Sequence, residues 1–126
     1  MTRYRYNQQV SPPAPFIYVS LQTADGDKAI SDLPAQLDTA ADRTVVPLQL
    51  TEELGLVALD SMPAIGFGGI VLNVPTFLMR LSLRGEDPVA LEVFASRDEP
   101  HILLGRDILN RYRFVLDGPG LILEAG

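Results

Sequence analysis

The sequence predicts one all-β domain in which many short strands close into a barrel. Short apolar stretches alternate with turn signals along nearly the whole chain, and neither a linker nor an internal repeat divides it. Residues 76–84 alternate most cleanly between apolar and polar side chains, as a strand with one buried face requires. The chain has 126 residues, of which 47% are hydrophobic, and this is enough for one modest core. The apolar positions that share a face in this stretch are Phe77, Met79, Leu81 and Leu83.

The polar start of the chain is expected to lie outside this barrel. Residues 1–15 contain Arg3, Arg5 and three prolines, so we interpret them as an extended or mobile N-terminal arm. The compact domain is therefore expected to span residues 16–126.

Strands and turns then follow one another through the domain. Residues 48–54 are compatible with a short helix, best supported near 51–54, with Thr51 as a cap and Gly55 as its end. A second short helix is expected at residues 105–112, with apolar side chains turned inward. The stretches expected to form strands are 16–21, 28–30, 57–65, 70–75, 76–84, 89–96, 101–104, 113–117 and 121–124.

The composition excludes several kinds of site. Without any cysteine, the chain has no disulfide, thiol nucleophile or cysteine-built zinc site, and its single histidine, His101, is interpreted as a strand residue. A formal net charge of −6 argues against nucleic acid as the main partner. No apolar stretch has membrane-spanning length, and no signal peptide is visible. We therefore expect a cytoplasmic protein with no cofactor, no metal and no membrane partner.

Residues 35–47, AQLDTAADRTVVP, are the most informative stretch for function. Asp38 is followed by Thr39 and two alanines, so nothing bulky occupies a loop that lies between two apolar strands. Such a loop presents a carboxylate for chemistry. Taken alone, the stretch fits equally well an aspartate that only caps a turn.

Three motifs, in this order, resemble the retropepsin-like aspartic proteases. They are Asp38-Thr39-Ala40-Ala41-Asp42, the glycine-rich Gly66-Phe67-Gly68-Gly69, and the stretch 102–109 with Gly105-Arg106-Asp107 at its centre. The resemblance covers roughly residues 16–124. It implies a closed barrel with a flap hairpin and one short C-terminal helix, although residues 66–69 also fit an ordinary hairpin turn.

The resemblance also implies a mechanism, in which two carboxylates share one proton and activate a water. Because the chain has one such loop, two copies would each supply Asp38 across a twofold axis, giving a homodimeric aspartic endopeptidase that hydrolyses peptides or proteins. Thr39 would hydrogen-bond across that axis, and Asp42 would pair with Arg106. The terminal segments 1–15 and 121–126 are expected to find their partners there, with residues 121–123 near the axis.

Substrate would lie between the loop and the flap, which would close over the peptide. Thr39, Ala40 and Ala41 would support the active-site loop. The residues implied in substrate binding are Asp42, Val46, Ile65, Gly66, Phe67, Gly68, Gly69 and Leu103, with Ile70 also lining a pocket.

Ala40 stands where these proteases carry glycine. If the position required a positive φ, the methyl group would cost on the order of 1 kcal/mol, whereas at a negative φ it would only narrow the site. A second function therefore stays open, a retropepsin-like dimerisation or peptide-binding module without proteolysis. A barrel that binds a small molecule would leave the three ordered motifs unexplained.

Overall fold

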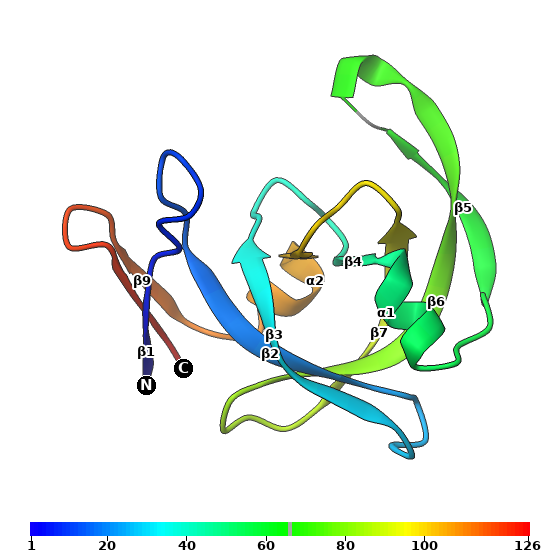
Figure 1. Cartoon of the computed structure of the whole chain (residues 1–126), viewed down its shortest axis with the longest axis horizontal. Helices are drawn as coiled ribbons and strands as arrows, with labels where there is room; N and C mark the ends of the chain where they lie inside the picture. Colours follow the sequence, from blue (N-terminus) through cyan, green and yellow to red (C-terminus); the bar gives the residue numbers. More distant parts are fainter. Residues whose placement is uncertain (66) are drawn as a thin grey trace.

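The computed structural model describes residues 1–65 and 67–126, and only the backbone of Phe67. Six strands close into a barrel in the order β2-β3-β8-β4-β7-β6, and β6 pairs back onto β2 (Figure 1). The predicted all-β barrel is therefore confirmed. The barrel strands are β2 (Phe16–Gln22), β3 (Ala29–Leu37), β4 (Val45–Pro47), β6 (Val71–Leu83), β7 (Val89–Ser96) and β8 (Ile102–Leu104).

Alternating side chains fill the interior of the barrel. On β6 the four apolar positions that share a face, from Phe77 to Leu83, are all buried, and Leu91, Val93 and Ala95 of β7 are buried in the same way. Period-2 alternation predicts this because successive strand residues point to opposite faces of a sheet.

The parallel pairing of β3 with β8 determines where two loops leave the barrel. β3 runs parallel to β8, from Ala35 opposite Ile102 to Leu37 opposite Leu104. Because the ends of parallel strands lie at the same edge, the loop that begins at Asp38 and the segment that begins at Gly105 leave the barrel side by side. Motifs far apart in the sequence thus meet at one end of the barrel.

Among the described residues there are two short α-helices, α1 (Leu48–Glu53) and α2 (Arg106–Leu109). Thr51 does not cap α1 as predicted, because it lies inside the helix, buried, and its hydroxyl donates to the Leu48 carbonyl at 2.6 Å. Gly55 follows the helix with a φ of 67°, a conformation that favours glycine. Within the residues described, neither helix has the length and apolar character needed to cross a bilayer.

The β5–β6 hairpin rises beyond the barrel (green in Figure 1). β5 (Asp60–Ile65) pairs antiparallel with the first half of β6, from Asp60 opposite Thr76 to Ile65 opposite Val71. At the tip, Gly68 and Gly69 have φ values of 81° and 79°. Glycine adopts such angles without a steric cost, which explains the glycine-rich sequence of the turn.

The two ends of the chain form a separate sheet of three strands beside the barrel, in the order β1-β10-β9 (Figure 1). β1 (Thr2–Arg5) and β9 (Phe114–Asp117) flank β10 (Ile122–Ala125), and both pairings are antiparallel. The N-terminal segment is thus extended but not loose, and Tyr4 is only 6% exposed. Strands of the same chain occupy both edges of β10, and the expectation that residues 121–123 lie near a twofold axis stays a prediction.

Candidate active site

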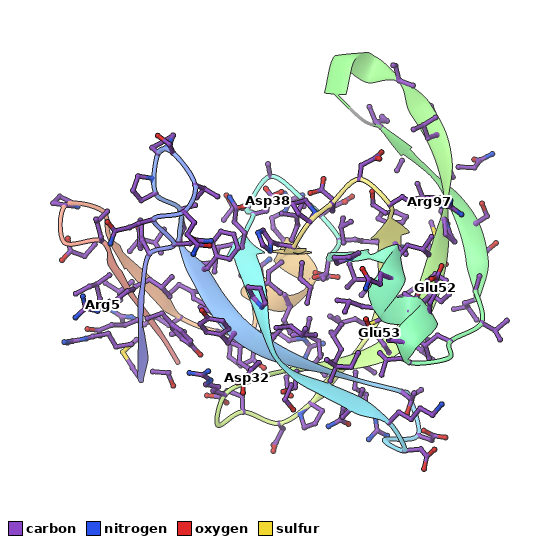
Figure 2. All side chains as sticks on the ribbon, in the orientation of Figure 1. Arg5, Asp32, Asp38, Glu52, Glu53 and Arg97 are labelled. Atoms are coloured by element: carbon purple, nitrogen blue, oxygen red, sulfur yellow. The ribbon has the colours of Figure 1, made fainter. Side chains whose placement is uncertain are left out.

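Asp38 lies at the open end of the barrel, directly after β3 (Figure 2). Its backbone N–H donates to the Leu104 carbonyl at 3.0 Å, and its own carbonyl accepts the N–H of Ala41 at 3.2 Å. The side-chain Oδ1 accepts the N–H of Ala40 at 3.1 Å, whereas Oδ2 accepts no hydrogen bond from the described residues. The half-buried carboxylate is therefore oriented by the loop through one oxygen only.

Ala40 takes its place in this loop without backbone strain. In the described chain, the non-glycine residues with positive φ are Asp32 and Leu121, so Ala40 is not among them. The loop conformation does not require glycine at this position. The alanine therefore carries no steric cost of a positive φ. It still narrows the site, because its side chain lines the adjacent cavity.

Arg106 forms hydrogen bonds with the loop, but not with Asp42, the partner that the sequence predicts. Its Nη1 donates to the Thr39 carbonyl at 2.7 Å, and its backbone N–H donates to the Ala41 carbonyl at 2.9 Å. The ion pairs among the described residues do not include one between Asp42 and Arg106. The guanidinium reaches a backbone carbonyl instead, while the Asp42 side chain is exposed at the surface.

Gly105 and Asp107, on either side of Arg106, bind Thr44, which follows the Asp38 loop. Asp107 accepts two hydrogen bonds from Thr44, a residue with no exposed surface, and the N–H of Gly105 donates to the Thr44 hydroxyl. A Cβ at Gly105 would lie 2.5 Å from the Arg43 carbonyl carbon, so only glycine permits this approach. The Gly-Arg-Asp motif therefore holds the Asp38 loop in place. Sequence reasoning did not predict the hydrogen bonds between Thr44 and Asp107.

A cavity of about 560 Å³ lies between this loop and the half of β5 that leads to the tip of the β5–β6 hairpin. Ala40, Ala41, Asp42 and Arg106 line it from the site, and Ile65 lines it from the hairpin. Its other walls, which sequence reasoning did not identify, are Arg43, Val45, Met62, Pro63, Ala64 and Phe94.

Val46 does not line this cavity, and the correction follows from strand geometry. Val46 is 0% exposed and points into the barrel, whereas Val45 points outward and lines the cavity. The prediction therefore chose the wrong face of β4. Leu103 lies half-buried opposite Val45 in the β4–β8 pairing and is not among the residues that line the cavity.

The hairpin presents apolar side chains that nothing in the single chain covers. Ile65 is 79% exposed, Ile70 62%, Val71 60% and Leu72 59%. Exposed apolar groups gathered on one element are typical of a binding surface. Gly66 and the side chain of Phe67, both predicted to contact substrate, lie outside the described residues.

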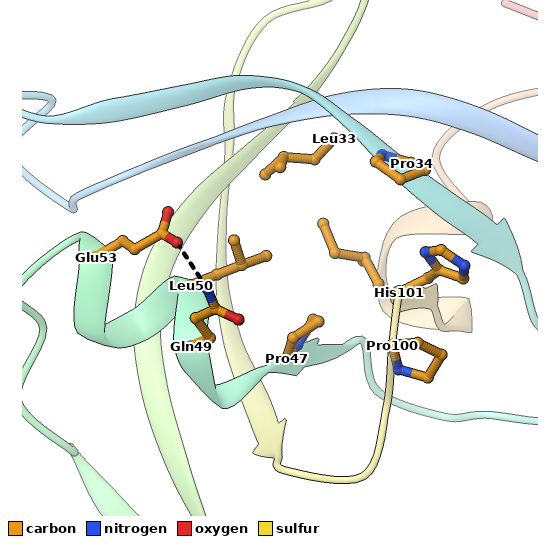
Figure 3. A pocket seen from close by; sticks show the side chains of 9 residues that line it. Leu33, Pro34, Pro47, Gln49, Leu50, Glu53, Pro100 and His101 are labelled. Atoms are coloured by element: carbon orange, nitrogen blue, oxygen red, sulfur yellow. Dashed lines mark hydrogen bonds between the residues drawn. The ribbon is translucent and has the colours of Figure 1, made fainter.

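A smaller cavity of about 150 Å³ lies between α1, β3 and the turn before β8 (Figure 3). Leu33, Leu50 and His101 are among its lining residues, and none of the predicted site residues is. The His101 ring packs edge-on against Phe16 with 5.2 Å between the ring centroids. His101 therefore contributes to packing, at a place separate from the Asp38 loop.

Solved structures with the same fold are known. The chain is similar to the EIAV protease in complex with the inhibitor HBY-793, with 24% identity, a TM-score of 0.53, and coverage of 80% of this chain and 89% of that one. It is also similar to a retropepsin-like aspartic protease from Rickettsia conorii, with 15% identity, a TM-score of 0.65, and coverage of 99% and 91%. No protein-family model and no curated protein matches the sequence. The predicted retropepsin-like fold is therefore confirmed.

Proposed function

We propose that two copies of this chain form one aspartic endopeptidase site, to which each copy contributes Asp38. The observation that carries the proposal is the setting of this carboxylate. Its Oδ1 is held by the loop, its Oδ2 accepts no hydrogen bond from the described residues, and the next residues of the loop line a cavity of about 560 Å³. The likeness in fold to solved aspartic proteases supports the same conclusion.

The chemistry needs the second copy because a single carboxylate cannot serve as both acid and base. Two carboxylates in contact cannot both be ionised, so the pair holds one shared proton and a water between them. The ionised Asp38 removes a proton from the water as it attacks the peptide carbonyl, and the protonated partner donates to the carbonyl oxygen. The exposed Thr39 would hydrogen-bond to the partner chain beside this pair.

An extended peptide fits the surfaces around the cavity. β5 is the last strand of its sheet, so its outer edge offers backbone groups to which a substrate strand can hydrogen-bond. The apolar hairpin would act as a flap that closes over the peptide and excludes water. Asp42, exposed at the margin of the cavity, would bind the backbone of the substrate.

A peptide-binding module without proteolysis is the second candidate. The bond between the Ala40 N–H and Asp38 Oδ1 is also what an aspartate that only stabilises a turn would form. The Ala40 methyl group, at the cavity wall, favours the same alternative because it narrows the space beside the carboxylate.

Cleavage of a peptide library between roughly pH 3 and pH 7, around the ordinary carboxylate range, tests the proposal. We expect cleavage to be best at acidic pH and to be lost when the pair gives up its shared proton. Asp38→Asn should abolish cleavage while peptide binding and the dimer persist. Asp87→Asn, an identical change at an exposed turn, is the control. A dimeric wild type that binds peptides but cuts none in this range would establish the binding module instead.

A further inference from the structure

Methionine is a common target of oxidation, and this chain has three, with no cysteine and no tryptophan. The three side chains differ in their access to an oxidant. Met79 is 0% exposed in the barrel core, and Met1 is 70% exposed, directly before β1. Met62 is half-buried and lines the cavity beside the Asp38 loop. Of the three, Met62 alone combines access with a place in the candidate site.

The sulfur of Met62 lies against a cation. Arg43 Nη1 donates to Met62 Sδ at 3.4 Å. Two further contacts keep the guanidinium there, since it lies 5.6 Å from the centre of the Phe94 ring and 3.7 Å from Glu92 Oε1. Met62 belongs to β5 of the hairpin, whereas Arg43 follows the Asp38 loop. The contact therefore joins two walls of the cavity that belong to different parts of the chain.

We propose that Met62 is a reversible oxidation site, and that its sulfoxide binds Arg43 and holds the hairpin against the Asp38 loop. The oxidant is hydrogen peroxide. The thioether sulfur attacks one peroxide oxygen, and an S–O bond forms while the O–O bond breaks. The departing hydroxide takes the proton of the transferred hydroxyl and leaves as water. The sulfur loses the two electrons that the peroxide gains, and methionine sulfoxide reductases reverse the change.

Oxidation converts a weak hydrogen-bond acceptor into a strong one. A thioether sulfur accepts weakly, whereas a sulfoxide is polar and presents an oxygen with partial negative charge. Because Arg43 already donates to the sulfur, its guanidinium lies within reach of the new oxygen and can form a charge-assisted hydrogen bond with it. Glu92 competes only weakly for the same charge, since the pair is partly exposed and 3.7 Å apart.

This bond would lower the affinity of the cavity for a peptide. It would occupy Arg43, a cation in the cavity wall, and it would place a polar oxygen among apolar lining residues such as Val45 and Phe94. It would also restrain β5, whose outer edge is the proposed pairing site of a substrate strand. At this step the inference rests on the proposed function, because it takes this cavity as the peptide site.

Peroxide treatment followed by mass spectrometry tests the oxidation site without a substrate. We expect Met62 to gain one oxygen while Met79 stays unmodified, and a methionine sulfoxide reductase to restore Met62. Amide exchange in residues 60–65 should become slower on oxidation of the wild type, but not of Arg43→Leu, which has no side-chain donor. An unmodified Met62, exchange that is not slowed, or equal slowing in Arg43→Leu would overturn the proposal, whether or not the chain binds or cleaves peptides.

A matched pair of variants tests the effect on peptides. Met62→Leu and Met79→Leu each replace methionine by an apolar residue of similar volume. Oxidation of Met79→Leu should weaken binding of an acidic peptide about tenfold, the effect of one hydrogen bond to a charged group, whereas oxidation of Met62→Leu should leave binding unchanged. Equal losses in the two variants would overturn the proposal. A loss confined to Met79→Leu, in a protein that cuts no peptide, would support the oxidation site and remove the proposed peptidase.

Discussion

Thr44 is joined to Asp107 by two hydrogen bonds, from its backbone N–H to Oδ2 at 3.0 Å and from its hydroxyl to Oδ1 at 2.8 Å. The Thr44 hydroxyl oxygen also accepts the N–H of Gly105 at 3.2 Å. The two residues are 63 positions apart in the sequence. Their hydrogen bonds hold the segment that follows the Asp38 loop against the start of α2. This contact explains why a motif late in the chain is needed by a loop in its first half.

Asp107→Ala should therefore destabilise the protein. The Thr44 N–H would be left buried without an acceptor, which costs about 1–3 kcal/mol. Asp107→Asn keeps one side-chain oxygen as an acceptor and should cost less. Urea unfolding measures both, with Asp87→Ala as the control at an exposed turn residue whose side chain makes no hydrogen bond to the described residues. Equal stability of Asp107→Ala and Asp87→Ala would show that the contact is not important.

Gly105→Ala should be poorly tolerated for a purely steric reason. The backbone at this position is extended, with a φ of −83°, so alanine meets no dihedral penalty. Its Cβ, however, would lie 2.5 Å and 2.7 Å from the Arg43 carbonyl atoms, which cannot move aside as a flexible side chain would. We expect a loss of about 1–3 kcal/mol in the free energy of unfolding.

Gly118→Ala is the matched control for this change. Nothing lies within 4 Å of a Cβ built at Gly118, and its φ is not positive. This variant should therefore unfold at nearly the same urea concentration as the wild type. A Gly105→Ala protein as stable as this control would contradict the close approach of the two loops.

The sequence predicted the order of the elements well but not the contacts between them. Alternation along residues 76–84 located the buried face of β6, because a long strand repeats the pattern several times. β4 has three residues, Val45–Pro47, too few to show which side is buried, and the wrong valine was chosen. The pairing of β1 with β10 joins residues as far as 121 positions apart, such as Arg3 and Glu124, and no local pattern of either segment records it.

Ala40→Gly should lower the free energy of unfolding slightly, because the alanine causes no backbone strain that glycine could relieve. Because Ala40 has no positive φ, glycine would release no strain and would add freedom to the unfolded chain. The expected loss is about 0.4–1 kcal/mol in urea unfolding. Any faster cleavage by this variant would have to come from a wider cavity. A gain in stability would contradict the conformation of the loop.

Tyr4 should make the stability of the protein depend on alkaline pH. Burial raises the pKa of the Tyr4 hydroxyl above its ordinary value of 10.0, and nearby Arg84 opposes this in part. The folded state therefore keeps a proton that the unfolded chain loses, so the free energy of unfolding should fall as pH rises above about 10. Tyr4→Phe should flatten this decline, which urea unfolding from about pH 8 to pH 11 measures. An unchanged slope would contradict the burial of the Tyr4 side chain, which β1 contributes to the three-stranded sheet.

Arg43 should select for acidic side chains in the substrate. Its guanidinium lies 5.6 Å from the centre of the Phe94 ring, and its Nη1 lies 3.4 Å from Met62 Sδ and 3.7 Å from Glu92 Oε1. All but Glu92 line the cavity beside the Asp38 loop. Because a partly exposed ion pair contributes only about 0–1 kcal/mol, Glu92 leaves much of this charge available to a ligand.

Profiling of cleavage sites in a peptide library checks this expectation. The wild type should prefer an acidic residue at one substrate position, and Arg43→Gln should lose that preference while still cleaving neutral peptides. Arg97→Gln is the matched control, since Arg97 lies on the exposed turn after β7 and does not line the cavity (Figure 2). The same loss in both variants would indicate a general effect of net charge, and no loss in either would mean that Arg43 does not face the substrate.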